Sequence, residues 1–313
     1  MESKCAAFWR HTNVRSDNNI FPCCRYKEPI ATFNGDVKNI LHLQPYEELR
    51  QRSLNNEPIS GCSKCYEEER IGRKSLREKF NEEYTIDTVA LEYLEIGFDN
   101  ICNLTCDGCW SDFSSAWAKK QGLDKTIQIR TTDPITKIPN TINKLLFLGG
   151  EPLMTTRHIK LLDLVENKSQ VEVTYNTNGT FLFSEDAVSL LKQFKQVNVI
   201  LSIDGYGDLN EHVRSGSSWK DILVFIGQVR SLGYSLEIHT VIHINNWHGL
   251  KQLESFVNVV TEQWSINFLT YPTHLDIINE PRRDDVIKML ESIELVDVSP
   301  IINRLCYSTQ PST

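Results

Sequence analysis

Three closely spaced cysteines, Cys102, Cys106 and Cys109 in the run CNLTCDGCW, constrain this chain more than any other feature. Cubane iron–sulfur clusters are held by cysteine thiolates, and complete ligation needs four of them. A compact run that supplies three leaves one iron open unless a distant residue fills it. An open iron is a position at which a small molecule can bind and react.

Structural zinc is the alternative interpretation of the triplet, with the fourth ligand supplied from elsewhere. Zinc ligands usually come as two C-x2-C pairs, whereas this run has the spacing CxxxCxxC. The spacing therefore favours an iron–sulfur cluster.

Size and composition indicate an ordinary globular protein. The 313 residues, 40% hydrophobic and 24% charged, are enough for one large domain and a small one. No stretch of about 18 apolar residues is present, and the start MESKCAAFWRHTN lacks the features of a secretion signal. We therefore expect a soluble, cytoplasmic protein that needs no membrane.

The formal net charge of -8 argues against a nucleic acid as the main partner, because binding to phosphates requires concentrated Lys and Arg. Nine cysteines without a secretion signal are better explained by metal ligation than by disulfides, since the cytosol keeps thiols reduced.

Strand-like and helix-like segments alternate after residue 90. The predicted strands are 92–98, 144–150, 171–178, 198–205, 236–243 and 265–272, and the clearest amphipathic stretches between them are 184–196 and 218–233. Strands separated by helices predict an α/β fold with a parallel sheet, whose site lies at the carboxyl ends of the strands.

Polar and glycine-rich motifs fall at those carboxyl ends. Cys102 follows the first strand, and GGEP, residues 149–152, follows the second. Asn176 to Asn178 close the third strand, Ser202 and Asp204 close the fourth, and Asn245 and Asn246 follow the fifth. We expect these residues to line one rim of the sheet.

Taken together, CxxxCxxC, GGEP, TNG and SIDG resemble the radical S-adenosylmethionine (SAM) superfamily over roughly residues 88–275. The resemblance implies a partial (β/α)6 TIM-like barrel in which SAM occupies the fourth site of the cluster. It also implies the residues that hold SAM: Gly149, Gly150, Glu151 and Pro152 for the ammonium, Asn178, Ser202 and Asp204 for the ribose and carboxylate, and Arg214 for the carboxylate. One position departs from the usual pattern, because Gly108 stands where an aromatic residue commonly precedes the last cysteine.

The amino-terminal region carries a second group of cysteines, Cys5, Cys23, Cys24, Cys62 and Cys65. Four ligands that end in a C-x2-C pair would close a complete site with no open position, for which zinc is one candidate. Residues 1–80 also resemble half of a SPASM, or twitch, domain, which implies an auxiliary 4Fe-4S cluster. Adjacent residues of an extended segment point in opposite directions, and we favour Cys23 over Cys24 as the ligand.

The resemblance implies an enzyme that cleaves SAM reductively to a 5′-deoxyadenosyl radical, which then removes a hydrogen atom from the substrate. It points to a ribosomally made peptide as substrate, modified by cross-linking, epimerisation or excision of a fragment. A small metabolite such as a sugar or alcohol is the second hypothesis, and a non-catalytic, zinc-stabilised binding protein is the third. Implied partners are the peptide, a separate leader-binding protein, and an electron donor such as flavodoxin or ferredoxin.

Cys306, in the expected carboxyl-terminal helical extension 276–313, is a candidate hydrogen-atom donor to a substrate radical. Cys24 is a second candidate for that role. A free cysteine more often behaves as a small hydrophobic residue, so a structural role is the alternative. Glu237, His239 and Tyr271 are further candidates for contact with the substrate, because of their positions in the predicted strands.

Overall fold

The computed structural model describes residues 3–123 and 135–307. The chain divides into two compact units. Unit 1 comprises Met1–Ile101, Asp124–Tyr175 and Phe183–Val197, and unit 2 comprises Cys102–Leu123, Asn176–Leu182 and Asn198–Thr313. No helix in the described residues has the length and apolar character needed to span a membrane.

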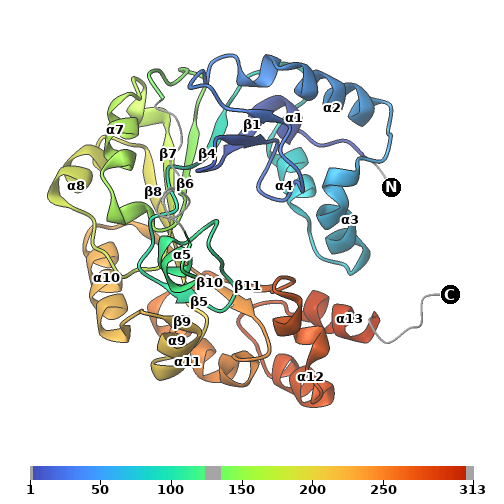
Figure 1. Cartoon of the computed structure of the whole chain (residues 1–313), viewed down its shortest axis with the longest axis vertical. Helices are drawn as coiled ribbons and strands as arrows, with labels where there is room; N and C mark the ends of the chain where they lie inside the picture. Colours follow the sequence, from blue (N-terminus) through green and yellow to red (C-terminus); the bar gives the residue numbers. More distant parts are fainter. Residues whose placement is uncertain (1–2, 124–134, 308–313) are drawn as a thin grey trace. The chain divides into compact units, whose positions relative to one another are not determined.

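Unit 1 is built on a mixed sheet with the order β3-β2-β1-β4-β6-β7, of which β1, β4, β6 and β7 are labelled in Figure 1. The strands are β1 (His11–Val14), β2 (Asn19–Phe21), β3 (Ala31–Thr32), β4 (Tyr93–Gly97), β6 (Lys144–Leu148) and β7 (Glu172–Thr177). The helices of this unit are α1 (Ala7–Arg10), α2 (Gln44–Leu54), α3 (Ser63–Arg70), α4 (Leu76–Glu83), α7 (Arg157–Asp163) and α8 (Glu185–Leu191), with the 3-10 turns η1 (Ile40–His42), η2 (Ser60–Cys62), η3 (Pro152–Met154) and η4 (Lys168–Gln170).

Strand β1 joins the amino-terminal region directly to this sheet. It pairs in parallel with β4, with Asn13 opposite Glu95, and antiparallel with β2. The hydroxyl of Tyr46, a fully buried residue of α2, donates to Thr12 Oγ1 at 2.8 Å. The cysteine-bearing segment is therefore fixed to the sheet by backbone pairing as well as by packing.

One face of the unit 1 strands forms the core. Phe147 and Tyr175 are fully buried, and their ring centroids lie 5.0 Å apart. Tyr175 also contacts Phe183, which precedes α8. The register places Asn13, Glu95, Leu146 and Thr174 together on the opposite face, because side chains alternate along a strand.

Unit 2 contains parallel strands in the order β8-β10-β11 (Figure 1). These strands are β8 (Gln196–Ser202), β10 (Ser235–Ile242) and β11 (Trp264–Phe268), and a separate pair is β5 (Thr105–Cys106) with β9 (Arg214–Ser215). The helices are α5 (Ser115–Lys120), α9 (Asp208–Val213), α10 (Trp219–Ser231), α11 (Leu250–Val260), α12 (Arg283–Glu291) and α13 (Ser299–Tyr307), with the turns η5 (Trp247–Gly249), η6 (Thr273–Leu275) and η7 (Ile277–Asn279).

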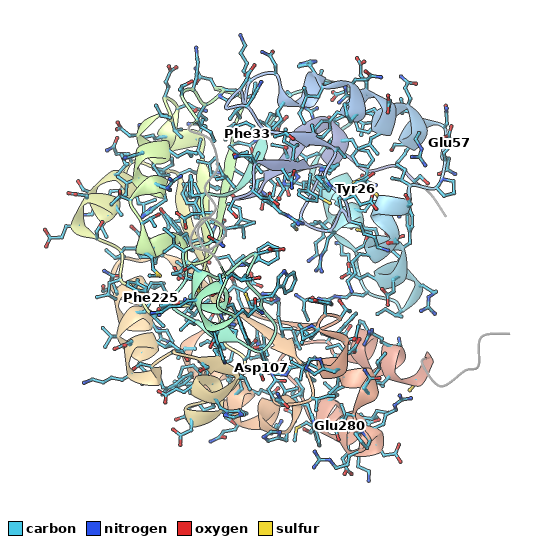
Figure 2. The ribbon with its side chains drawn as sticks, in the orientation of Figure 1. Tyr26, Phe33, Glu57, Asp107, Phe225 and Glu280 are labelled. Carbon is cyan, nitrogen blue, oxygen red and sulfur yellow. The ribbon has the colours of Figure 1, made fainter. Side chains whose placement is uncertain are left out.

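Helix α10 illustrates how the sequence specifies these elements. Ser218 caps it by accepting a hydrogen bond from the Asp221 N–H at 3.3 Å. Ile222, Phe225 (labelled in Figure 2) and Val229 recur at helical spacing and are fully buried. The helix therefore buries one apolar stripe, and its exposed side carries Leu223 and Val224 as well as polar residues.

All of the predicted strands are present, within three residues of the predicted bounds, except that 265–272 ends early, at Phe268. The predicted α/β fold with a mainly parallel sheet is confirmed. Closure into a partial barrel, and domain boundaries at residues 80, 88 and 275, stay predictions.

Candidate metal and cofactor site

The cysteine triplet lies in a loop of unit 2 that a short strand pair anchors. Strand β5 pairs antiparallel with β9, which places Cys106 directly opposite Arg214. The Asp107 N–H donates to Val213 O at 2.9 Å. Two motifs far apart in the sequence, CxxxCxxC and EHVRSG, are thereby brought together.

Ser115 and Trp117, which follow the triplet, fix the loop through hydrogen bonds to its backbone. Ser115 Oγ accepts from the Cys102 N–H at 3.1 Å and donates to the Cys102 carbonyl at 3.2 Å. The Trp117 indole donates to the Cys106 carbonyl at 2.9 Å. The first turn of α5 thus fixes the backbone of the loop, and its three cysteines are half-buried.

Electrostatics couple the thiols to one another and to Arg214. Burial raises the pKa of Cys106 to about 11, against the lowering effect of Arg214. Burial, followed by the charges of Cys106 and Cys102, raises the pKa of Cys109 to about 12. The charges of Cys102 and Cys106 thus act on Cys109, and that of Cys102 acts on Cys106.

Arg214 is held by Asp204. Its Nη1 donates to Asp204 Oδ2 at 2.7 Å, and Asp204 Oδ1 accepts from the Val241 N–H at 2.7 Å. Burial disfavours the charged guanidinium, but Cys106 and Asp204 outweigh burial and raise the pKa of Arg214. Arg214 Nε is buried and has no hydrogen-bond partner among the described residues. A cation with a free buried N–H beside three thiols fits an anionic group such as a cluster or a carboxylate.

The TNG motif also reaches the triplet. Asn178 is buried, and its Nδ2 donates to Asn103 Oδ1 at 3.1 Å and contacts Cys102 Sγ at 3.9 Å. Ser202 Oγ donates to Asn176 Oδ1 at 3.2 Å. Unit 2 therefore brings Cys102, Cys106, Asn178, Asp204 and Arg214 into one connected set of contacts.

The GGEP motif belongs to unit 1, where it lies against the segment that leads into the triplet. The Gly150 N–H donates to Asp99 O at 2.9 Å, and the Glu151 N–H donates to Ile101 O at 2.7 Å. Glu151 is almost fully buried, and its Oε1 accepts from the Leu153 N–H at 3.1 Å at the start of η3. These backbone bonds end at Ile101, the residue before Cys102.

Backbone conformation explains the glycine at position 149, and close packing against the Ile101 carbonyl explains the one at position 150. Gly149 has φ +138°, a conformation that disfavours other residues. A Cβ at position 150 would lie 2.3 Å from the Ile101 carbonyl oxygen.

The second group of cysteines lies in unit 1. Cys5, Cys62 and Cys65 are buried, and Cys5 and Cys62 belong to an apolar cluster with Phe8, Trp9 and other residues. Burial raises the pKa of Cys5, and the charges of Cys62 and Cys65 add to the increase. Burial likewise raises the pKa of Cys23, with further increases from Cys24, Cys5 and Cys65. The buried thiols of Cys5, Cys23, Cys62 and Cys65 are thus electrostatically coupled.

Cys24 has different surroundings. It is exposed to solvent, and the largest charge effect on it comes from Glu95 of β4. Its thiol hydrogen-bonds with that carboxylate and helps to lower the pKa of Glu95, which His11 and Asn13 also contact.

In the described residues, no three His, Cys, Asp or Glu side chains converge on a point that a single metal ion could fill.

Gly108 is explained by Leu269. A Cβ at position 108 would lie 2.9 Å from Leu269 Cδ1, so the space that an aromatic side chain would need is already filled.

Trp110 contacts Phe113 and Tyr271, in each case with ring centroids 4.9 Å apart. A cavity of about 360 Å³ beside Cys109 is lined by Trp110 and Tyr271 together with Asp107 and Asn245, which hydrogen-bond to each other. Cys306 is exposed on α13.

Several contact residues were missed from the sequence. Asp99, Asn103 and Ser115 each organise the loop through hydrogen bonds. Their only sequence signal was their position beside Cys102.

Residues 98–257 match the profile of the Radical SAM superfamily. The match covers just over half of the chain, and the chain belongs to this superfamily.

Curated relatives include the GTP 3′,8-cyclase of Nostoc punctiforme, 23% identical over 187 residues, which are 58% of this chain and 56% of that protein. The GTP 3′,8-cyclase of Alkaliphilus metalliredigens is 24% identical over 177 residues, 55% and 53% of the two chains. The chain thus spans little more than half the length of these relatives.

Similar solved structures include native anSMEcpe with bound AdoMet, at TM-score 0.48 and 16% identity over 65% of this chain and 59% of that one. Streptococcus suis SuiB bound to S-adenosylmethionine has TM-score 0.47 and 15% identity over 79% and 51%. SuiB bound to the precursor peptide SuiA has TM-score 0.45 and 14% identity over 85% and 53%.

Gly150→Ala should prevent correct assembly of the triplet, because the added Cβ must displace the backbone that ends at Ile101. We expect at least half of the iron bound after anaerobic reconstitution to be lost, measured as iron per protein. Gly227→Ala is the matched control, since nothing lies within 4 Å of a Cβ there. Equal iron contents in the two variants would show that the close approach is not needed.

Proposed function

We propose that this chain is a radical SAM enzyme in which Cys102, Cys106 and Cys109 bind a 4Fe-4S cluster whose fourth iron binds SAM. The observation that carries the proposal is the placement of Arg214, with its unpartnered Nε, opposite Cys106. When bound, the cluster and SAM supply reductive cleavage of SAM and removal of a hydrogen atom from the substrate.

The residues around the triplet have distinct tasks in this proposal. Arg214 pairs with the SAM carboxylate, and Asp204 positions the guanidinium by occupying Nη1. Asn178 and Ser202 hydrogen-bond the carboxylate and ribose, and Gly149, Gly150, Glu151 and Pro152 form the ammonium site. Asp204 is a positioning residue in this account, because both of its oxygens already accept hydrogen bonds from the protein.

Reduced, reconstituted protein should form 5′-deoxyadenosine from SAM, whereas Cys102→Ala, Cys106→Ala and Cys109→Ala should each reduce the yield by at least a hundredfold. Each substitution removes one of three thiolates from a site that has no spare ligand. Liquid chromatography after addition of dithionite measures the product. Ser231→Ala, on the exposed face of α10, is the control. A colourless, zinc-containing protein that leaves SAM intact would instead support the binding-protein hypothesis.

We propose that Cys5, Cys23, Cys62 and Cys65 hold an auxiliary 4Fe-4S cluster. The mutual coupling of their buried thiols supports this set, and the exposure of Cys24 together with its contact with Glu95 favours Cys23 over Cys24 as the ligand. Four protein ligands leave no open iron, which suits electron transfer better than substrate ligation.

Cys62→Ala should lower the iron content from about eight to about four per chain, because one of two cubes loses a ligand. Cys24→Ser should retain about eight. Iron analysis with Mössbauer spectroscopy distinguishes the outcomes. Equal iron in wild type and Cys62→Ala would exclude Cys62 as a ligand, and loss of iron in Cys24→Ser would reassign the fourth thiolate.

We propose a ribosomally made peptide as the substrate, with an electron donor such as flavodoxin or ferredoxin and a separate leader-binding protein as partners. The second cysteine set supports this class, since the twitch units that it resembles serve enzymes that act largely on peptides. SuiB has been solved with a precursor peptide. A small metabolite is the second candidate, and it is favoured by the GTP 3′,8-cyclase relatives.

Co-expression with neighbouring short reading frames should yield a peptide of altered mass that disappears in Cys106→Ala. Mass spectrometry of the purified peptides measures the change. Turnover of GTP by the reduced enzyme, with no altered peptide, would favour the metabolite instead.

A hydrogen-atom donor can be identified by solvent deuterium. If the peptide product retains solvent deuterium with wild type but not with Cys306→Ala, Cys306 is the donor, and the same loss in Cys24→Ala would identify Cys24.

A further inference from the structure

The strands of unit 2 have one polar, half-exposed face. The register aligns Ser202 of β8, His239 of β10 and Ser265 of β11, so these side chains project from the same face. Glu237 and Asn267 belong to the same alternation, and all five residues are partly exposed. We call these five residues the polar face of unit 2.

The opposite face is the core. Leu201, Ile238 and Ile266 are buried there, and α10 packs against β10. The polar face also carries two partly exposed apolar residues, Ile200 opposite Glu237 and Val241 opposite Asn267. Apolar side chains with a few hydrogen-bonding groups at fixed positions are the usual lining of a small-molecule site.

Glu237 provides the only formal charge of the polar face. Its Oε1 accepts a hydrogen bond from Ser265 Oγ at 2.6 Å. No Lys or Arg of residues 3–123 or 135–307 forms an ion pair with it. His239 contacts the side chain of Asn267, and Ser202 donates to Asn176. The face therefore presents one uncompensated carboxylate among neutral hydrogen-bonding groups.

We propose that the polar face binds a protonated amine or guanidinium of the substrate, with Glu237 as the acceptor. This inference rests on the proposed function and adds the chemical class of the group that is recognised. A charge-assisted hydrogen bond to a carboxylate is stronger than one between neutral groups. A phosphate group would instead bring negative charge towards Glu237, and like charges disfavour binding. The polar face thus favours a cationic group of the substrate over a phosphate group.

The test uses the reconstituted full chain and three probes: Nα-acetyl-L-lysine amide, the neutral Nα-acetyl-L-glutamine amide, and GTP. Dissociation constants are measured by calorimetry or ligand-observed NMR. We expect the lysine probe to bind about tenfold or more tightly than the glutamine probe, as a charge-assisted hydrogen bond implies. Glu237→Gln should abolish this difference. The control Glu291→Gln, at an exposed carboxylate of α12, should retain it.

A charge-reversed variant distinguishes loss of the carboxylate's charge from a folding defect. Glu237→Lys should lose the lysine probe and gain Nα-acetyl-L-glutamate amide, while its thermal unfolding stays within a few degrees of wild type. Equal binding of the lysine and glutamine probes to wild type, or no binding of either, would overturn the proposal, as would tight GTP binding that Glu237→Gln leaves unchanged. Formation of 5′-deoxyadenosine by wild type is measured separately. Its absence would refute the radical SAM proposal without touching the probe result.

Discussion

The antiparallel pairing of β5 with β9 is the contact on which the candidate site depends. It is only two residues long on each strand, and so short a pairing contributes little stability by itself. The buried ion pair of Arg214 with Asp204, and the bond from the Val241 N–H to Asp204, tie it to β10. Because removal of one partner from a buried pair costs about 3–5 kcal/mol, Asp204 controls the geometry beside Cys106.

Backbone pairing also sets the position of the amino-terminal cysteines. Strand β1 adds to the sheet beside β4, and the polar residues His11 and Asn13 reach Glu95 from it. The same carboxylate contacts Cys24. The adjacent residues Cys23 and Cys24 therefore differ in their surroundings, because Cys23 is buried whereas Cys24 is exposed and contacts the buried carboxylate of Glu95.

Local pattern was sufficient to predict the strands after residue 90, because alternation and turn residues are encoded within each segment. It also predicted that TNG would follow a strand whose carboxyl end lies near the triplet, and Asn178 contacts Cys102 Sγ within unit 2. The pairing of β1 with β4 and of Cys106 with Arg214 could not be predicted, because both are contacts between distant segments with no local signal. The same holds for Leu269, whose side chain fills the space beside Gly108.

Three thiolates should leave one iron of the cluster open for SAM, and electron–nuclear double resonance on the reduced protein can detect SAM at that iron. With SAM labelled by ¹⁵N at its amino group, we expect a hyperfine coupling of that nitrogen to a 4Fe-4S cluster. The coupling should persist in Cys62→Ala, which retains only the cluster of the triplet. A reduced cluster whose spectrum is identical with and without SAM would contradict the account.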